Sequence, residues 1–502
     1  MKNQAYALDR LALTTYGISG QKLMDKAGKK IADFINSNFS DMNSISIVAG
    51  KGNNGGDGFA AAVYLNKCGF SITVFSIYNT QYFSDETSYY YKECLKEDIN
   101  VIFASDPPSP YDFNSLAIDS MLGIGFKGEL YKNLKNWATW INRFSVVVSC
   151  DIPTGVCSDS GTVCTKAVKA DYTIAMGYPK IGSFVEPGKS YSGAISSADI
   201  GFPNKINELN GQKWNVITDD LIKNILQPLK KNTHKYKQGK VLILAGSEGM
   251  TGAAYLATMG ALRSGCGLTK TFAPKSLNNI YERKITEGMT VSCEDKGSGF
   301  FTNDNYNQIM DNIDWADTVL IGPGLGRNKD TVRLLHNLYV EVEKPMVVDA
   351  DGFSPFYNDF SLIKKIKNDF VFTPHLGELS KLLKIDSEEL KVDKINIIEK
   401  MTTDMSGVLV VKSDSTIISD GLNGYINLTG NPGLATAGTG DVLSGVIASL
   451  ISQGYNSLES SIVSTFIHGL AADNQSNNIS QRGLIASDLL IEIGKILSGY
   501  EL

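Results

Sequence analysis

The stretch "SISIVAGKGNNGGDGFAAAVYL" (44–65) determines the fold prediction for the first part of the chain. A short β-rich run leads into a cluster of glycine and asparagine, and an apolar run typical of a helix follows. Ordering so many glycines costs backbone entropy, which favours a ligand-binding role over a simple tight turn. Bare N–H groups at a helix start suit an anionic or nucleotide ligand.

Gly50, Gly52 and Gly55 match the G-x-G-x-x-G pattern of dinucleotide-binding folds. That pattern requires an acid at the end of the second strand to bind a ribose, but the second strand here ends in "FSIYNTQ". The chain also contains no G-x-x-x-x-G-K-[ST], so it has no P-loop. We therefore expect the ligand to be held by another arrangement.

Short β-rich runs alternate with helix-length segments along the whole chain, which predicts α/β architecture with parallel strands covered on both faces. The composition changes near residues 203–239, which are first polar and then basic and show no periodic spacing of apolar residues. With 502 residues the chain is too long for one core, and we place a junction at about residue 211, giving domains 1–210 and 211–502. The predicted strands are 44–50, 71–77, 115–121, 146–151 and 172–177, then 240–246, 318–324, 346–352, 370–375 and 408–413.

Composition narrows the class of protein. Apolar residues make up 43% and charged residues 20%, with a net charge of -6 and no block of Lys or Arg, so neither nucleic acid nor a membrane is an expected partner. The N-terminus is amphipathic and lacks the apolar core of a signal peptide. Seven scattered cysteines and four separated histidines suggest reduced thiols, a cytoplasmic location and no zinc site.

Polar residues follow three predicted strands of the first domain. Asp119 and Asp151 end two of these strands, and Asn54 and Thr154 lie in neighbouring loops. Because ligands bind at the carboxyl ends of parallel strands, these loops should converge. A donor set of oxygens suits an alkali or alkaline-earth cation, although either aspartate alone could be a helix N-cap.

The second domain has a comparable stretch, "GNPGLATAGTGDVLSG" (430–445). Gly438, Thr439 and Gly440 precede Asp441, which opens an apolar helix whose N–H groups could bind phosphate. Asp441 is therefore a candidate acid/base, with a simple N-cap as the alternative. Other residues at strand ends are Asp349, Asp351, His375, Glu378, Lys412 and Thr416.

Together these motifs resemble a known fusion, the bifunctional NAD(P)H-hydrate repair enzymes. "GNNGGDGF", "FKGE", "DIPTG" and "GYPKIGSFVEPGK" resemble NAD(P)H-hydrate epimerases. "GSEGMTGAA", "ALRSGCGL", "IGPGLG", "DADG", "TPHLGE" and the 430–445 stretch resemble ADP-dependent (S)-NAD(P)H-hydrate dehydratases, which are relatives of ribokinase-like kinases. The resemblance covers nearly all of the chain.

The resemblance implies an N-terminal Rossmann-like three-layer αβα domain followed by a C-terminal ribokinase-like αβα domain. It implies that the first domain interconverts the R and S epimers at C6 of hydrated NADH and NADPH (NADHX and NADPHX). The second domain would remove water from the S form with ADP, with Mg²⁺ beside the nucleotide. The resemblance also implies a homo-oligomer.

The resemblance assigns site residues by position. Asp151 and Asp441 are the expected catalytic groups, and K⁺ is expected on Asn54, Asp119 and Thr154. Expected substrate contacts in the first domain are Asn53, Asn54, Gly55, Gly56, Asp57, Gly123, Ile124, Gly125, Phe126, Lys127, Gly128 and Glu129. Those in the second domain are Ala253, Gly324 and His375, and ADP is expected on Lys412, Ser413, Asp414, Ser415, Thr416, Thr439 and Gly440.

Four positions depart from the family pattern. Asp25 and Lys26 stand where many members have Glu and Asn, which could change the charge near the site entrance. Leu376 replaces a common proline and could loosen its turn, and Ser413 replaces a frequent glycine. The alternative functions are a small-molecule kinase of the ribokinase-like class fused to a nucleotide-binding domain, and a nucleotide-binding scaffold with one inactive domain.

Overall fold

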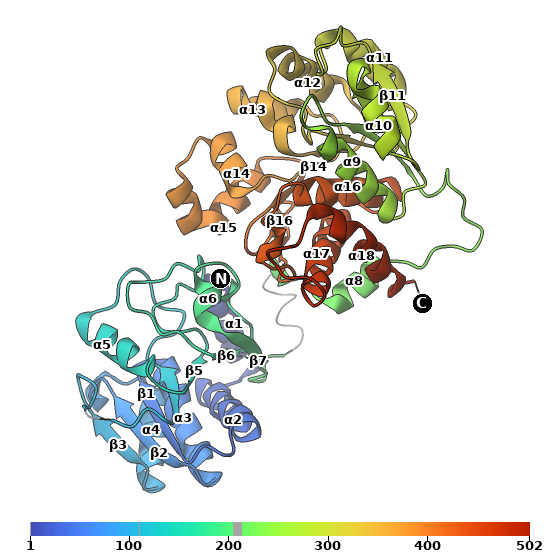
Figure 1. The fold of residues 1–502 in the computed structure, drawn as a ribbon. Coiled ribbons are helices and arrows are strands. Elements are labelled where there is room, and N and C mark those ends of the chain that lie inside the picture. The colour runs from blue at the N-terminus through green and yellow to red at the C-terminus, as the bar shows by residue number, and fades with distance from the viewer. Residues whose placement is uncertain (1, 110, 204–212, 502) are drawn as a thin grey trace. The chain divides into compact units, whose positions relative to one another are not determined.

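The computed structural model describes residues 2–109, 111–203 and 213–501, and it divides the chain into two compact units, 1–212 and 213–502 (Figure 1). The predicted junction near residue 211 lies outside the described residues. Each predicted β-rich run forms a strand, as expected. No helix in the described parts is long and apolar enough to cross a membrane.

The first unit is built on a seven-stranded sheet in the order β3-β2-β1-β4-β5-β6-β7, and every neighbouring pair is parallel. Apolar side chains of α2, α3 and α4 pack on one face, and those of α5 pack on the other. These are the three layers that the resemblance implied. The strands are β1 (Ser44–Ala49), β2 (Ser71–Ser76), β3 (Asn100–Phe103), β4 (Leu116–Ser120), β5 (Val146–Cys150), β6 (Tyr172–Met176) and β7 (Ala194–Ala198).

The helices of this unit are α1 (Lys2–Tyr16), α2 (Gly20–Asn38), α3 (Asn53–Lys67), α4 (Asp85–Lys96), α5 (Lys132–Ile141) and α6 (Gly188–Ser192). Single 3₁₀ turns lie at Thr80–Tyr82 and Ile181–Ser183.

The second unit has a ten-stranded sheet in the order β11-β10-β9-β12-β13-β14-β15-β16-β17-β8. It is parallel from β11 to β15, but β15, β16 and β17 pair antiparallel, so this end of the sheet is mixed. The strands are β8 (Trp214–Val216), β9 (Lys240–Leu244), β10 (Leu268–Pro274), β11 (Met289–Cys293), β12 (Thr318–Ile321), β13 (Met346–Val348), β14 (Phe370–Phe372), β15 (Val408–Val411), β16 (Ile417–Ser419) and β17 (Gly424–Ile426).

The helices of the second unit are α8 (Asp219–Ile225), α9 (Thr251–Arg263), α10 (Asn278–Lys284), α11 (Tyr306–Ile313), α12 (Lys329–Glu341), α13 (Ser354–Asn358), α14 (Leu376–Leu383), α15 (Ser387–Thr403), α16 (Thr439–Ser452), α17 (Ser457–Ser476) and α18 (Ala486–Ser498). The 3₁₀ turns are Lys275–Leu277, Asn303–Asn305, Ala350–Phe353, Phe360–Lys365 and Pro432–Leu434.

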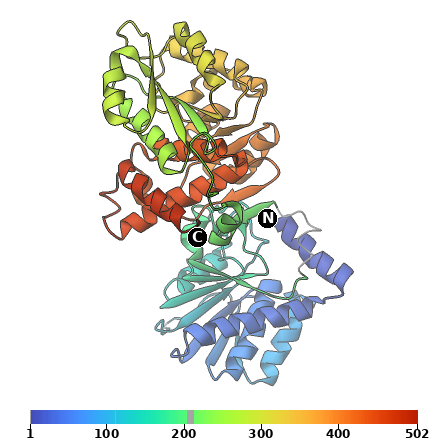
Figure 2. The same ribbon diagram turned by 90° about the vertical axis from the view of Figure 1, so that its right-hand side faces the viewer.

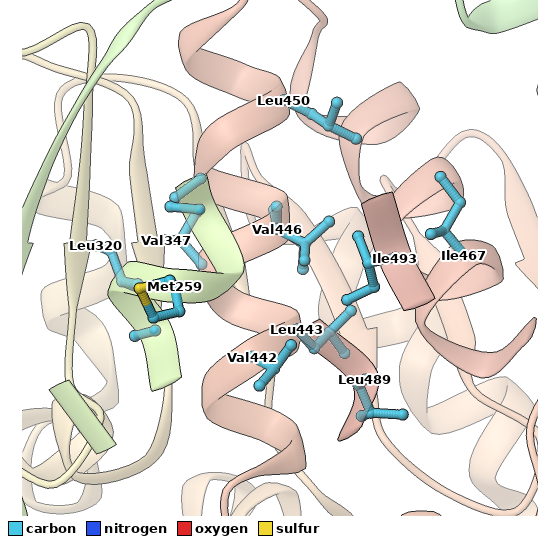
Figure 3. Close-up of a cluster of buried hydrophobic side chains, with 14 of the residues drawn as sticks. Met259, Leu320, Val347, Val442, Leu443, Val446, Leu450, Ile467, Leu489 and Ile493 are labelled. Atoms are coloured by element: carbon cyan, nitrogen blue, oxygen red, sulfur yellow. The ribbon is translucent and has the colours of Figure 1, made fainter. Parts of the chain in front are cut away.

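Helix α16 lies at the centre of the second core. Figure 3 shows Val442 and Val446 of this helix between the sheet residues Leu320 and Val347 and the outer helices α17 and α18. The opposite face of the sheet is covered by α12 and α13, whose Tyr339 and Phe356 rings lie 4.9 Å apart. The red α16–α18 and the yellow-green α10–α12 are seen again in Figure 2. Since α16 is buried on nearly all sides, the position of its first turn is fixed by packing.

The structure corrects the expected start of the helix after β1. We predicted a glycine loop up to Asp57, but α3 begins at Asn53, so Gly55, Gly56 and Asp57 lie in its first turns. A Cβ on Gly55 would lie 2.0 Å from the Gly50 carbonyl oxygen, and one on Gly58 would lie 2.1 Å from Ser120 Oγ. These glycines therefore let the helix start pack directly on the sheet.

This packing predicts that Gly55→Ala destabilises the first unit. The added Cβ meets backbone that cannot move away, and overpacking of this kind costs about 1–3 kcal/mol. Gly52→Ala is the matched control because a Cβ there has open space around it. Calorimetric unfolding of the full chain should show a lowered transition for Gly55→Ala and little change for Gly52→Ala. Equal transitions would contradict this role.

Candidate functional sites

A cavity of about 640 Å³ opens in the first unit at the carboxyl ends of its central strands. Its wall comes from the β1–α3 connection, the loop after β4, the start of the loop after β5, and helices α1 and α2. This convergence follows from the parallel order of the strands. The predicted site residues that line it are Asn53, Asn54, Asp57, Gly123, Ile124, Gly125 and Asp151.

Some predicted substrate contacts lie elsewhere. Gly55 and Gly56 lie buried in the first turn of α3, and the segment 126–129 is outside the cavity wall. Glu129 of that segment instead pairs with Lys135 at 2.7 Å and accepts a hydrogen bond from Thr165. Asp25 also turns away from the cavity, because its Oδ1 accepts hydrogen bonds from the Tyr64 and Tyr90 hydroxyls at 2.7 and 2.9 Å. The expected change of charge at the site entrance is therefore not seen at Asp25.

Asp151 follows β5 directly and is held in a left-handed conformation, with φ 68°. Such a backbone is costly for a residue other than glycine and persists only where its surroundings hold it. The Asp151 carboxylate is buried, pairs with the buried ammonium of Lys180, and accepts the Met176 N–H at 3.0 Å. Sequence reasoning missed Lys180, although it lies within the quoted segment "GYPKIGSFVEPGK". The pair holds Asp151 at the cavity wall.

Asp57 lies one turn into α3 and faces the same cavity. Removal from water raises its pKa well above the ordinary value, the charges of Asp151 and Asp9 add to the rise, and Lys180 opposes it. Asp9, on α1, is another residue of the cavity wall that the sequence analysis did not single out. The cavity therefore holds several carboxyl groups that compete for the nearby positive charge of Lys180.

The three residues predicted to bind K⁺ lie near the carboxyl end of β4. Thr154 donates its hydroxyl to Asp119 Oδ1 at 2.7 Å and its N–H to Asp119 Oδ2 at 2.8 Å. Ser149 and the Met121 N–H also donate to the buried Asp119, whose pKa is raised by desolvation. Both polar atoms of the Asn54 side chain are buried without a hydrogen-bond partner. A Cβ on Gly123, in the loop after β4, would lie 3.5 Å from the Asn54 Cβ, so the orphaned amide lies by this loop and fits a cation ligand.

The second unit places Asp441 in the first turn of α16, two residues inside the helix start at Thr439. Gly438 before it adopts a left-handed conformation, with φ 94°. Desolvation raises the pKa of Asp441 to about 7, with Asp349 and Asp351 adding to the rise and Lys412 opposing it. Asp441 is thus suited to exchange a proton near neutral pH.

Lys412 follows β15 and pairs with the buried Asp349 at 2.6 Å. A Cβ on Gly440 would lie 3.1 Å from the Lys412 Nζ, so the ammonium lies against the exposed start of α16. A lysine and free N–H groups at a helix start form a phosphate-binding arrangement. The predicted contact Thr439 is used differently, because its hydroxyl donates to the carbonyl oxygens of Leu434 and Thr436 at 2.9 and 3.0 Å.

The rest of the predicted nucleotide segment forms the turn between β15 and β16. Ser413 donates its hydroxyl to the Ser415 carbonyl oxygen at 2.7 Å, and an Asp414 carboxylate oxygen lies 3.9 Å from the ammonium of the buried Lys394. The Thr416 carbonyl oxygen accepts the Asn427 N–H at 2.9 Å. Ser413, which departs from the family pattern, therefore helps to close this turn.

His375 precedes α14 and caps it. Its Nδ1 accepts the N–H groups of Gly377 and Glu378, while Glu378 Oε2 accepts the His375 N–H. The helix starts at Leu376, and the reciprocal bonds hold the turn that we expected to be loosened there. The imidazole remains exposed and can contact a ligand.

Ala253 and Gly324 lie against each other, since a Cβ on Gly324 would be 2.8 Å from that of Ala253. Nearby, Asp351 accepts from Arg327 Nε at 2.9 Å and from the Gly326 N–H at 3.0 Å. Ala253, Gly324, His375 and Asp441 come from four different elements at the carboxyl ends of the parallel strands. The second unit thus has an acid in the first turn of a helix whose start lies against a lysine, with a histidine and two small residues on other elements of the same sheet edge.

Comparison with known proteins matches a different family to each unit of the chain. Residues 241–495 match the family described as NAD(P)H-hydrate dehydratase, and residues 20–182 match the family described as YjeF-related protein N-terminus. A bifunctional NAD(P)H-hydrate repair enzyme of Moorella thermoacetica is 33% identical over 98% of this chain and 95% of its own length. A protein of the same name from Thermofilum pendens is 33% identical over 98% and 94%.

Among solved structures, a ribokinase-like superfamily protein from Enterococcus faecalis matches with a TM-score of 0.51 and 22% identity, over 58% of this chain and 97% of that chain. The likeness confirms the ribokinase-like fold that was predicted for the second domain. With both halves matched in order and a relative similar over almost its full length, the chain belongs to the family of bifunctional NAD(P)H-hydrate repair enzymes.

Proposed function

We propose that the chain repairs hydrated NADH and NADPH in two steps at two separate sites. The first unit interconverts the R and S hydrates, and the second dehydrates the S hydrate back to NAD(P)H in an ADP-dependent reaction. The observation that carries the proposal is the presence of both acid-bearing sites in a chain whose relatives of that name match over nearly their whole length. A ribokinase-like kinase would share only the fold of the second unit.

In the epimerase site, the proposed acid/base group is Asp151, acting on the C6 hydroxyl or the ring nitrogen of the hydrate. The Lys180 ammonium supports this role because it stabilises the ionised carboxylate and fixes its position. Exposed glycine backbone at Gly123 and Gly125 and the start of α3 would lie along the dinucleotide phosphates. The cavity of about 640 Å³ is large enough to take a substantial part of such a ligand.

A potassium ion fits beside this cavity. The unpartnered Asn54 Oδ1 and the Thr154 hydroxyl would be its ligands, and Asp119 would supply negative charge. Since four donors already occupy the Asp119 carboxylate, direct ligation by Asp119 requires one of them to turn away. Bound there, the ion would order the loops that carry Asn54 and Thr154.

In the dehydratase site, the C6–O bond must break, and hydroxide is a poor leaving group. Asp441, with a pKa of about 7, can donate a proton to the departing oxygen so that it leaves as water. Lys412 and the N–H groups at the start of α16 would stabilise phosphate charge next to it. His375, Ala253 and Gly324 would contact the hydrated substrate.

ADP is proposed to bind along the turn that carries Lys412 to Thr416 and at Gly440. In the described parts of the chain, no cluster of three or more His, Cys, Asp or Glu side chains could hold a metal ion. Mg²⁺ would accordingly be held mainly by the nucleotide phosphates and water, which is the usual manner for this ion. A homo-oligomer and a cytoplasmic location remain predictions.

Asp151→Asn should reduce epimerase turnover by about 10²–10⁴-fold, because a proton-transfer group is lost. Dehydration of S-NADHX by the same preparation is the internal control, since that reaction uses the other unit. Loss of the buried pair to Lys180 also weakens the fold, so unfolding should be measured in parallel. Equal loss of both activities in a folded protein would contradict the assignment.

Asn54→Ala should remove most of the dependence of epimerisation on K⁺, because the amide oxygen is the unpartnered ligand. The rate would be measured in potassium buffer and in tetramethylammonium buffer at equal ionic strength. Asn66→Ala, on the same helix but outside the cavity wall, should keep the wild-type response. A wild-type rate that is the same in both buffers would contradict the potassium site.

Asp441→Ala should abolish dehydration of S-NADHX even with ADP in excess, whereas Asp404→Ala at an exposed position should not. If the protonated acid is the active form, the wild-type rate falls as the pH rises through about 7, where Asp441 loses its proton. Both effects can be followed by the return of NADH absorbance. A rate that increases across that pH range would show that Asp441 acts as a base instead.

A further inference from the structure

Helix α1 forms one wall of the epimerase cavity. Six of its residues line the cavity: Ala5, Tyr6, Leu8, Asp9, Arg10 and Leu13. The matched family segment begins only at residue 20, after this helix has ended. The first unit therefore completes its site with an element outside that segment.

The helix is fastened to the unit at both ends. At its start, the Lys2 N–H donates to Asp159 Oδ1 at 2.5 Å and Lys2 Nζ lies 3.4 Å from the Gly125 carbonyl oxygen, at the cavity loop. Toward its end, Leu8 and Ala12 are buried against Ile18, Leu23, Tyr178 and Phe202. The contacts hold the face that carries Asp9 toward the cavity.

Asp9 shares the cavity wall with three other carboxyl groups, those of Asp57, Asp151 and Glu86, and with the paired Lys180. The Lys180 ammonium forms its ion pair with Asp151 rather than with Asp57 or Asp9. The other charged residues of the wall are Arg10 on α1 and Lys51 before α3. Carboxylates that share a cavity disfavour one another's ionised form.

The surroundings favour Asp9 as a proton carrier that substrate can reach. Desolvation raises its pKa to about 6, Lys180 opposes this rise, and Asp151 adds to it. Asp9 is nevertheless solvent-exposed, so a substrate in the cavity can reach it. A group that titrates near the working pH transfers protons most effectively.

We propose that Asp9 is the proton-donating partner of Asp151 in epimerisation, an inference that rests on the proposed function of the first unit. Asp151 accepts the proton of the C6 hydroxyl, the C6–N1 bond breaks, and Asp9 gives its proton to N1. The products of this step are an aldehyde at C6 and an enamine N–H. Rotation about the C5–C6 bond presents the other face of the aldehyde, and the reverse transfers close the ring and restore both carboxyl groups.

The proposal requires Asp9 to be protonated, which sets the sign of the pH dependence. The wild-type epimerase rate, corrected for the rate without enzyme, should fall as the pH rises through about 6. The charged groups that face Asp9 are Lys180, Asp151 and Asp57, with Arg10 beside it on α1. Since Lys180 opposes the rise in pKa, removing its charge would move the fall to higher pH.

The test uses the full chain with purified R-NADHX. Asp9→Asn should lower the epimerase rate by about 10²-fold or more and remove the fall near pH 6, while Asp9→Glu should restore part of the rate. Asp41→Asn makes the same substitution at an exposed position outside the cavity and should behave as wild type. Dehydration of S-NADHX should be unchanged in every variant.

The outcomes separate this inference from the proposed function. If the wild-type protein does not epimerise R-NADHX at all, the proposed function fails. If it does, and Asp9→Asn keeps both the rate and the pH profile, the role of Asp9 is wrong. A lower rate with an unchanged pH profile would assign Asp9 a structural role and would also overturn the proposal.

Discussion

Both sites depend on the way parallel strands bring their carboxyl ends to one edge of a sheet. In the first unit, β1, β4, β5 and β6 end around the cavity, and in the second, β13, β14 and β15 deliver Asp349, His375 and Lys412. The side chains that meet at each edge come from segments that are far apart in the sequence. Burial of the sheet on both faces fixes the strand order, and the strand order brings the polar loops together.

The two units use a similar distribution of charge. In each, a lysine pairs with one buried carboxylate: Lys180 with Asp151, and Lys412 with Asp349. In each, another carboxyl group nearby has a raised pKa, Asp57 in the first unit and Asp441 in the second. A carboxyl group with a raised pKa close to an ion-paired carboxylate can supply an acid and a base in one site.

Periodicity and turn residues were enough to predict the central strands, because these are fully buried and rich in Val and Ile. The same signal missed the edge strands β3, β7, β8 and β11, several of whose residues are exposed or small, and the antiparallel strands β16 and β17. It also missed β10, in which Thr and Lys interrupt the apolar run. The start of α3 was misplaced because the glycines were interpreted as a ligand loop, whereas they also allow close helix–sheet packing. Lys180 and Asp9 could not be predicted as neighbours of Asp151 in the cavity wall, since only the folded chain brings them there.

The central claim is that one chain returns both epimers of a hydrated coenzyme to the reduced form. The most direct measurement incubates the full chain with mixed R- and S-NADHX, with and without ADP, and follows the absorbance of NADH. The account predicts complete recovery of NADH from both epimers when ADP is present and no recovery without it. Failure to recover NADH with ADP, or recovery that stops when the S hydrate is exhausted, would contradict it.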